Sequence, residues 1–184
     1  MSAAVNSGYL LDNNIISLLA RPQDPSHGSI KARLEALQGS PVFLPVIAIA
    51  EIEFGMAKAA AANPMQREAL HRFFVDYPLH LPIDDNTVEP YALIRAQVWH
   101  NHGTPKGRGH KEKLPEELTD RVTGKSLGID ERDLLIASTA AQYGLTLITN
   151  DSNEGMCRIE RAAQDLEMEG KPIRLRIDRW PQVP

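Results

Sequence analysis

The stretch Gly-Tyr-Leu-Leu-Asp-Asn-Asn, residues 8 to 14, decides the fold that we predict for this chain. Residues 9 to 11 form a short apolar run, typical of a buried strand, and the run ends in the acidic residue Asp12. A helical pattern of apolar residues begins directly afterwards, at Ile15 and Ile16. A carboxylate therefore stands where a buried strand ends and a helix begins, which is the edge of an open α/β sheet where ligands bind.

Outward from this stretch, segments of strand character alternate with segments of helical pattern. The pattern predicts strands near residues 9–11, 41–45, 79–83, 145–148 and 173–177, and helices near 15–20, 30–37, 47–62, 64–74, 87–99, 131–143 and 159–168. This order is typical of a mostly parallel sheet with helices on both faces. We therefore predict an α/β fold of three layers, α/β/α, formed by residues 1–184 as a single domain.

The composition is that of an ordinary globular domain. Of the 184 residues, 42% are hydrophobic and 24% are charged, which disfavours disorder and allows a proper core. The single Cys157 cannot form an intramolecular disulfide, and the apolar stretch 41–50 is too short to span a bilayer. We expect a cytoplasmic protein without a membrane segment.

The net charge is −4, from 20 basic and 24 acidic side chains. Taken alone, this charge disfavours a nucleic-acid partner, because phosphate contacts usually need a basic surface. The negative net charge is a misleading guide to the surface if four of the acids hold a metal ion, since the other 20 acids then balance the 20 basic side chains.

Residues 103–127 break the alternation of strands and helices. The segment is rich in Gly, Pro and charged residues and is too long and polar for a compact connection, so we predict a flexible inserted arm. One interpretation is a solvated loop. The other is an arm that contacts substrate phosphates through the basic side chains Lys106, Arg108, Lys111 and Lys113.

Four acids need an explanation. Asp12 and Asp151 follow two apolar strands, where a single acid is commonly a turn former. Asp133 is the third residue of a helix whose N-cap position suits Asp130. Glu51 lies within an apolar helix, predicted to be buried along most of its length, where an ionised carboxylate is costly without a partner. Because the helices concerned contain little Arg or Lys, a bound cation explains these acids best.

Together these residues resemble the PIN-domain ribonucleases and, within them, the VapC-type toxins of type II toxin–antitoxin pairs. Residues 9–17 (YLLDNNIIS) are similar to the opening motif of that family, and residues 46–56 (VIAIAEIEFGM) are similar to its second motif. Residues 133–151 (DLLIASTAAQYGLTLITND) are similar to its third and fourth motifs run together. The positions that match the motifs are Asp12, Asn14, Glu51, Asp133 and Asp151.

The resemblance implies a ribonuclease dependent on Mg²⁺ or Mn²⁺ that leaves 5′-phosphate and 3′-hydroxyl ends on RNA. Such ions prefer oxygen ligands. We predict Asp12 and Asp133 as direct ligands, with Glu51 and Asp151 acting through water or holding a second ion. We predict supporting roles for Asn14 and Thr149, and we expect the crowded carboxylates to raise the pKa of one member.

The resemblance also implies a cognate antitoxin that blocks the acidic cleft, and a homodimer. A PIN-like module that binds RNA or a protein without cutting is the main alternative. A phosphatase with Asp12 as nucleophile is less favoured, because Asn14 stands where that mechanism needs a second acid.

Overall fold

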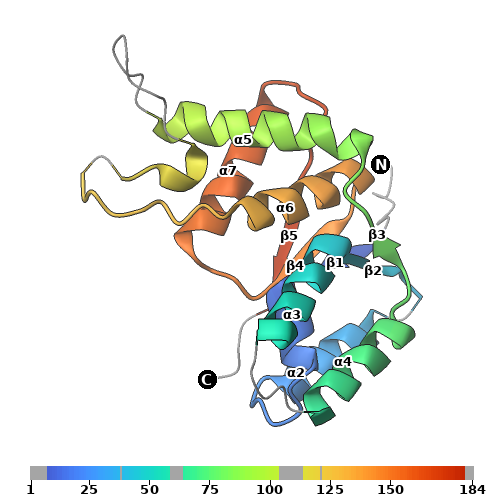
Figure 1. The fold of residues 1–184 in the computed structure, drawn as a ribbon. Helices are drawn as coiled ribbons and strands as arrows, with labels where there is room; N and C mark the ends of the chain where they lie inside the picture. The colour runs from blue at the N-terminus through green and yellow to red at the C-terminus, as the bar shows by residue number, and fades with distance from the viewer. Residues whose placement is uncertain (1–7, 38, 59–63, 104–113, 121, 181–184) are drawn as a thin grey trace.

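The computed structural model describes residues 8–37, 39–58, 64–103, 114–120 and 122–180 (Figure 1). The strands are β1 (Tyr9–Leu11), β2 (Val42–Pro45), β3 (His80–Leu81), β4 (Thr146–Thr149) and β5 (Arg176–Arg179). The helices are α1 (Asn13–Leu19), α2 (His27–Ala36), α3 (Val46–Lys58), α4 (Pro64–Asp76), α5 (Val88–His102), α6 (Glu131–Tyr143) and α7 (Glu154–Met168). Two short 3₁₀ helices are η1 (Asp85–Thr87) and η2 (Pro115–Glu117).

The five strands in the described part of the chain form one sheet in the order β3-β2-β1-β4-β5, and each neighbouring pair is parallel. Strands β2 and β3 lie on one side of β1, and β4 and β5 lie on the other. The strand order therefore reverses between β1 and β4, and ligand sites of open α/β sheets form at such a switch point. The predicted α/β architecture is confirmed.

Helices cover this sheet on both sides. Helix α5 packs against α6 and α7, and Figure 1 shows these three as one group above the labelled strands. Helices α2 and α4 lie below the strands in the same view. The central strands are buried between the layers, with Leu10, Leu11, Leu147 and Ile148 fully buried. Burial on both faces explains why these strands read as continuous apolar runs.

Helix α3 differs from its prediction. Its buried residues are Ala48 and Ile52, whereas the side chains of Phe54 and Val46 are 63% and 44% exposed. The prediction of a helix buried along most of its length is therefore wrong for residues 46–58. The helix packs along one stripe, against α1 and α6, and its apolar composition does not require the opposite face to be covered.

The described residues of the predicted arm form a packed turn. Leu118 and Leu127 belong to the hydrophobic core, and Thr119 pairs with Ser126 in an antiparallel bridge. Over residues 114–120 and 122–127 the chain is thus docked on the domain rather than a free arm, because Leu118 and Leu127 are buried, whereas Leu114 and Val122 are exposed. The predicted phosphate contacts at Lys106, Arg108, Lys111 and Lys113 lie outside the described residues.

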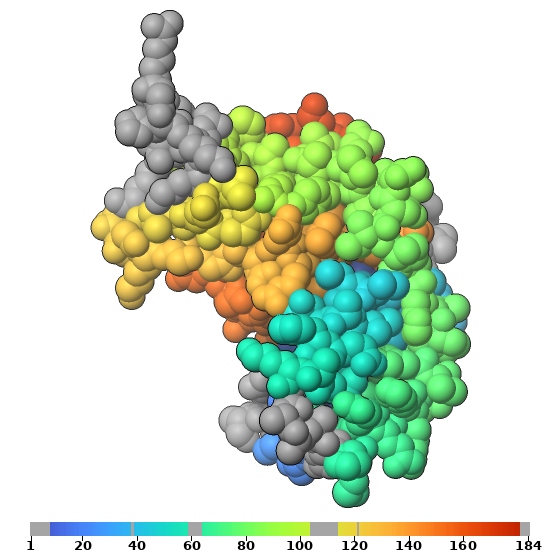
Figure 2. All heavy atoms as spheres, viewed as in Figure 1, coloured from blue at the N-terminus to red at the C-terminus, as the bar shows by residue number. Residues whose placement is uncertain are grey.

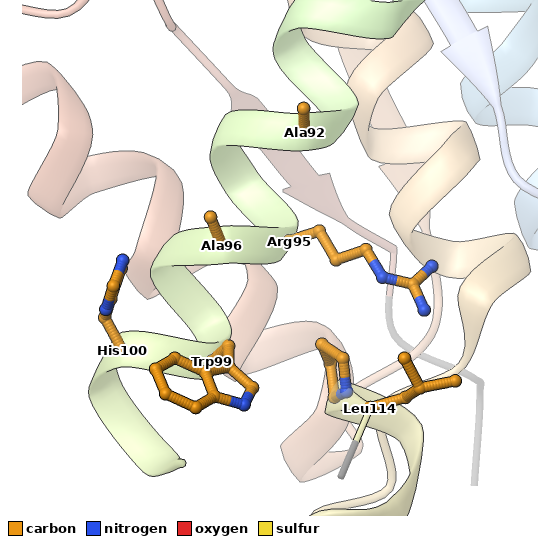
Figure 3. A pocket seen from close by; sticks show the side chains of 7 residues that line it. Ala92, Arg95, Ala96, Trp99, His100 and Leu114 are labelled. Atoms are coloured by element: carbon orange, nitrogen blue, oxygen red, sulfur yellow. The ribbon is translucent and has the colours of Figure 1, made fainter. Parts of the chain in front are cut away.

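Arg95 of α5 joins this turn to the start of α6. Its guanidinium forms ion pairs with Glu116 of η2 at 3.0 Å and with Glu131 of α6 at 2.7 Å. Figure 3 shows Arg95, Trp99 and Leu114 around a cavity of about 330 Å³ between α5 and the turn. The start of α6 is therefore fixed from the side of α5. In the described parts of the chain, no helix has the length and apolar character needed to cross a bilayer.

Candidate metal-binding site

Asp12 is placed by the end of β1 and the start of α1. Its backbone N–H donates to the carbonyl of Ile148 at 2.9 Å, which continues the pairing of β1 with β4. Its side chain caps α1, since Oδ1 accepts a hydrogen bond of 2.7 Å from the backbone N–H of Asn13. The residue is only 3% exposed, so its carboxylate needs these donors.

Asn14 and Thr149 hold the second oxygen of Asp12. Oδ2 accepts hydrogen bonds from Thr149 Oγ1 at 2.6 Å and from Asn14 Nδ2 at 2.9 Å. Thr149 Oγ1 in turn accepts from the backbone N–H of Asp151 at 2.9 Å, and Asn14 Oδ1 accepts from the backbone N–H of Asn150 at 3.2 Å. The two residues predicted to support the acids therefore tie the ends of β1 and β4 together.

Two opposing effects set the pKa of Asp12. Burial raises it, and the hydrogen bonds from Thr149 and Asn13 lower it; the net result is a pKa above the ordinary value. The negative charge of Asp151 adds to the increase. The charged form of Asp12 is thus held in place by donors but is not neutralised by them.

Asp133 lies in the first turn of α6, behind its N-cap Asp130. Burial, followed by the charge of Asp12 and smaller contributions from Asp130 and Asp151, raises the pKa of Asp133 to about 7. Among the residues that the structure describes, none donates a hydrogen bond to this carboxylate. The pKa is thus raised for two of the acids, Asp12 and Asp133; burial is the largest cause for both, and the neighbouring negative charges add to it.

Asp151 and Glu51 face other partners. The carboxylate of Asp151 accepts from the backbone N–H of Asn153 at 2.6 Å and from Asn153 Nδ2 at 2.5 Å, which forms a turn ahead of α7. Glu51 accepts a hydrogen bond from Arg132 Nη1. As the side chains stand, no three His, Cys, Asp or Glu residues in the described ranges are positioned to hold one metal ion.

Two glycines bring the start of α6 close to the start of α7. A Cβ on Gly155 would lie 1.9 Å from the carbonyl oxygen of Gly128, which itself adopts a φ of +68°. This close approach fixes the chain after Asp151 relative to the chain before Asp133. Figure 2 shows the surface hollowed between the orange residues above, around α6 and the start of α7, and the teal residues of α3 below.

Residues 9–162 match the model of the PIN domain. The chain belongs to the PIN-domain family. A ribonuclease named VapC14 from Mycobacterium tuberculosis (strain CDC 1551 / Oshkosh) is 34% identical over 73 residues, which are 40% of this chain and 69% of that protein.

Solved structures share the PIN fold. VapBC2 from Rickettsia felis, bound to a promoter DNA fragment, matches with a TM-score of 0.61 at 20% identity, over 94% of this chain and 98% of that chain. FitAcB from Neisseria gonorrhoeae matches with a TM-score of 0.55 at 26% identity, over 82% of this chain and 92% of that chain. VapBC-5 of Mycobacterium tuberculosis, a member of the VapBC family of toxin–antitoxin systems, matches with a TM-score of 0.54 at 21% identity, over 95% of this chain and 99% of that chain.

The donor set of this PIN domain suits a hard divalent cation. Carboxylate oxygens are the ligands that Mg²⁺ and Mn²⁺ prefer. Asp12 keeps a free lone pair on Oδ1, which accepts one hydrogen bond, whereas Oδ2 already accepts two. This oxygen and the carboxylate of Asp133, to which no described residue donates a hydrogen bond, are the atoms that would hold the ion.

Sequence reasoning missed Arg132. We expected the helices of the acids to contain too little Arg and Lys to pair with them, and this is wrong for Glu51, because Arg132 of α6 contacts it. Arg132 also forms an ion pair with Asp130. The alternation Asp130, Glu131, Arg132, Asp133 was a visible signal, but the partner of Arg132 depends on the packing of α3 against α6.

Proposed function

We propose that this PIN-domain protein is a VapC-type toxin that hydrolyses RNA phosphodiester bonds with Mg²⁺ or Mn²⁺. The observation that carries the proposal is the shared electrostatic field of Asp12, Asp133 and Asp151 at the switch point of the sheet, where the pKa of Asp133 is about 7. A cluster of this kind is short of positive charge, and a divalent ion supplies it. The similarity to a VapC ribonuclease supports RNA as substrate.

In this proposal Asp12 and Asp133 hold the ion directly. Asn14 and Thr149 keep the Asp12 carboxylate in one orientation through Oδ2, and Oδ1 is the oxygen that would bind the ion. Glu51 and Asp151 complete the acidic set through water or with a second ion, after leaving their present partners. The ion supplies water activation and offsets negative charge on the phosphodiester.

The partners in this proposal are RNA, a cognate antitoxin and a second copy of the chain. The similar structures with VapBC and FitAcB in their names support an antitoxin that covers the acidic site. We place the RNA at the hollow between α6 and α3 that Figure 2 shows. We place this activity in the cytoplasm, where cellular RNA is available.

The alternative is a PIN-like module that binds RNA or protein without cutting. One observation favours it: among the described residues, no three His, Cys, Asp or Glu side chains converge on a point where they could bind one metal ion. Cleavage of mixed cellular RNA in Mg²⁺, with EDTA and the variant Asp12→Asn as controls, separates the two functions. We expect cleavage in Mg²⁺ only; binding of RNA without any cleavage would support the module instead.

A further inference from the structure

Arg132 lies between the acid of α3 and the N-cap of α6. Its guanidinium contacts Glu51 and Asp130, which come from different elements, and its side chain is 50% exposed. It is also the direct chain neighbour of Asp133. Glu51, one of the four acids that match the PIN-domain motifs, is therefore already paired with a positive side chain.

The guanidinium divides its donors unequally. Nε donates to Asp130 Oδ1 at 2.8 Å and Nη2 donates to Asp130 Oδ2, so that two donors meet one carboxylate. The backbone N–H of Arg132 donates to the same Oδ1 at 2.8 Å. Glu51 is held by Nη1 alone. Paired donors from a planar guanidinium to one carboxylate form the stronger arrangement, so the contact to Glu51 is the one that breaks first.

The contact between Arg132 and Glu51 is easily exchanged. Half-exposed ion pairs are weak because water screens the charges. In the proposed function a divalent cation is held by Asp12 and Asp133, with Glu51 acting through water or on a second ion, and a doubly charged ion is a stronger partner for Glu51 than one guanidinium donor. Breaking the contact leaves Arg132 anchored to Asp130, with Nη1 unpaired at the rim of the site.

Glu131, the other acid of this turn, does not compete for Arg132. Its carboxylate accepts hydrogen bonds from Tyr91 Oη at 2.6 Å and from Arg95 Nη1 at 2.7 Å. These partners belong to α5, away from Glu51. Arg132 therefore has Glu51 as its one acidic partner outside its own turn, among the residues that the structure describes.

We infer that Arg132 and a divalent cation are alternative partners of Glu51, and that the released Nη1 of Arg132 then binds a phosphate oxygen of RNA. This inference rests on the proposed function, because it takes the cation and the RNA from it. It assigns Arg132 two duties, as an internal counter-ion in the metal-free protein and as a substrate-binding residue in the loaded one.

The first test measures Mn²⁺ binding by isothermal titration calorimetry in the full-length chain without RNA. The variants are Arg132→Gln, Glu51→Gln, the double variant, and Arg174→Gln as the matched control. Arg174 also forms one exposed ion pair, with Glu167, and it precedes β5, at the opposite end of the sheet from Asp12. Circular dichroism melting curves check that each variant is folded.

We expect Arg132→Gln to bind Mn²⁺ about fivefold more tightly, the factor that corresponds to loss of an exposed ion pair. In the Glu51→Gln background the same change should have a much smaller effect, because the competition acts through Glu51 and only the direct interaction of the Arg132 charge with Asp133 is left. An equal gain in both backgrounds, or in Arg174→Gln, would reduce the effect to net charge and overturn the inference. Unchanged affinity in Arg132→Gln would overturn it as well.

The second test measures RNA cleavage at saturating Mn²⁺, where competition for Glu51 no longer matters. We expect Arg132→Gln to lower kcat/KM about tenfold, mainly through KM, and Arg132→Lys to recover part of it, since a charge-assisted contact to phosphate is lost and partly restored. An unchanged KM in Arg132→Gln would contradict the proposed contact between Arg132 and RNA. The wild-type chain in both tests checks the proposed function itself. That function fails if the wild type binds no Mn²⁺ and cleaves no RNA.

Discussion

The hydroxyl of Thr149 donates a hydrogen bond of 2.6 Å to Oδ2 of Asp12, joining residues that are 137 positions apart in the chain. The contact follows from the parallel pairing of Leu11 with Ile148, which brings the next residues of both strands to one edge of the sheet. Asp12 therefore owes its orientation to the neighbouring strand as much as to its own helix cap.

Thr149→Val tests this relationship, because valine keeps the shape of threonine and removes the donor. The buried Asp12 carboxylate would lose one hydrogen bond, and we expect the free energy of unfolding at pH 8 to fall by about 1–3 kcal/mol. Mn²⁺ affinity should fall as well, since the carboxylate is less well oriented. Urea denaturation and calorimetry measure the two effects. Thr149→Ser restores the hydroxyl and should behave like the wild type; equal loss in both variants would contradict the assignment.

Asp133→Asn should abolish RNA cleavage and leave the fold intact. Without metal, the variant removes a carboxylate whose ionisation is opposed by burial and by Asp12. We expect its melting temperature in EDTA at pH 8 to exceed that of the wild type by about 4–8 °C, which corresponds to about 2 kcal/mol in a domain of this size. Differential scanning calorimetry measures this shift. A fully active Asp133→Asn protein would contradict the metal-site assignment.

The pH dependence of stability in EDTA isolates Asp133 when wild type and Asp133→Asn are compared. The pKa of this carboxyl group is about 7 in the folded protein, against an ordinary value of 3.8. Between these values the folded state keeps a proton that the unfolded chain has lost, so the free energy of unfolding falls as pH rises, by up to about 1.4 kcal/mol per pH unit. The stability that the protonated Asp133 carboxyl group contributes is fully present below pH 4 and is lost above pH 7. Parallel stability curves for the two proteins between pH 4 and pH 8 would refute the raised pKa.

Gly155→Ala tests the contact between the starts of α6 and α7. The added Cβ would clash with the backbone carbonyl of Gly128, so one of the two segments must move. We expect a loss of about 1–3 kcal/mol in the free energy of unfolding and slower RNA cleavage, because Asp151 shifts relative to Asp133. Gly28→Ala is the control, since a Cβ at Gly28 meets no atom within 4 Å. An active and fully stable Gly155→Ala protein would show that this contact does not position the acids.

The RNA contacts of four basic residues in the segment 103–127 are a separate prediction. Changing Lys106, Arg108, Lys111 and Lys113 to Ala should weaken RNA binding and flatten its dependence on salt, because fewer counter-ions are released from the phosphates. Fluorescence anisotropy at several salt concentrations measures both quantities. An unchanged salt slope would favour the solvated-loop interpretation of these residues.

Local pattern was enough to predict much of this protein. The apolar runs and helical spacing predicted the α/β fold, because burial between two helical layers demands them. The strand-end position of Asp12 and the N-cap at Asp130 were equally visible, since both depend on residues next to them in the chain. The family motifs then predicted Glu51, Asp133 and Asp151 as further acids of the proposed metal site.

Only the tertiary structure decided the pKa values of these acids and which of them has a basic partner. Which carboxylates have a raised pKa depends on burial and on the charges that folding brings near them, and these carboxylates are Asp12 and Asp133. The pairing of Glu51 with Arg132 and the exposed side of α3 likewise depend on how α3 packs. Sequence determines which charges exist, but their interaction energy depends on separation and solvent exposure, which only the folded chain defines.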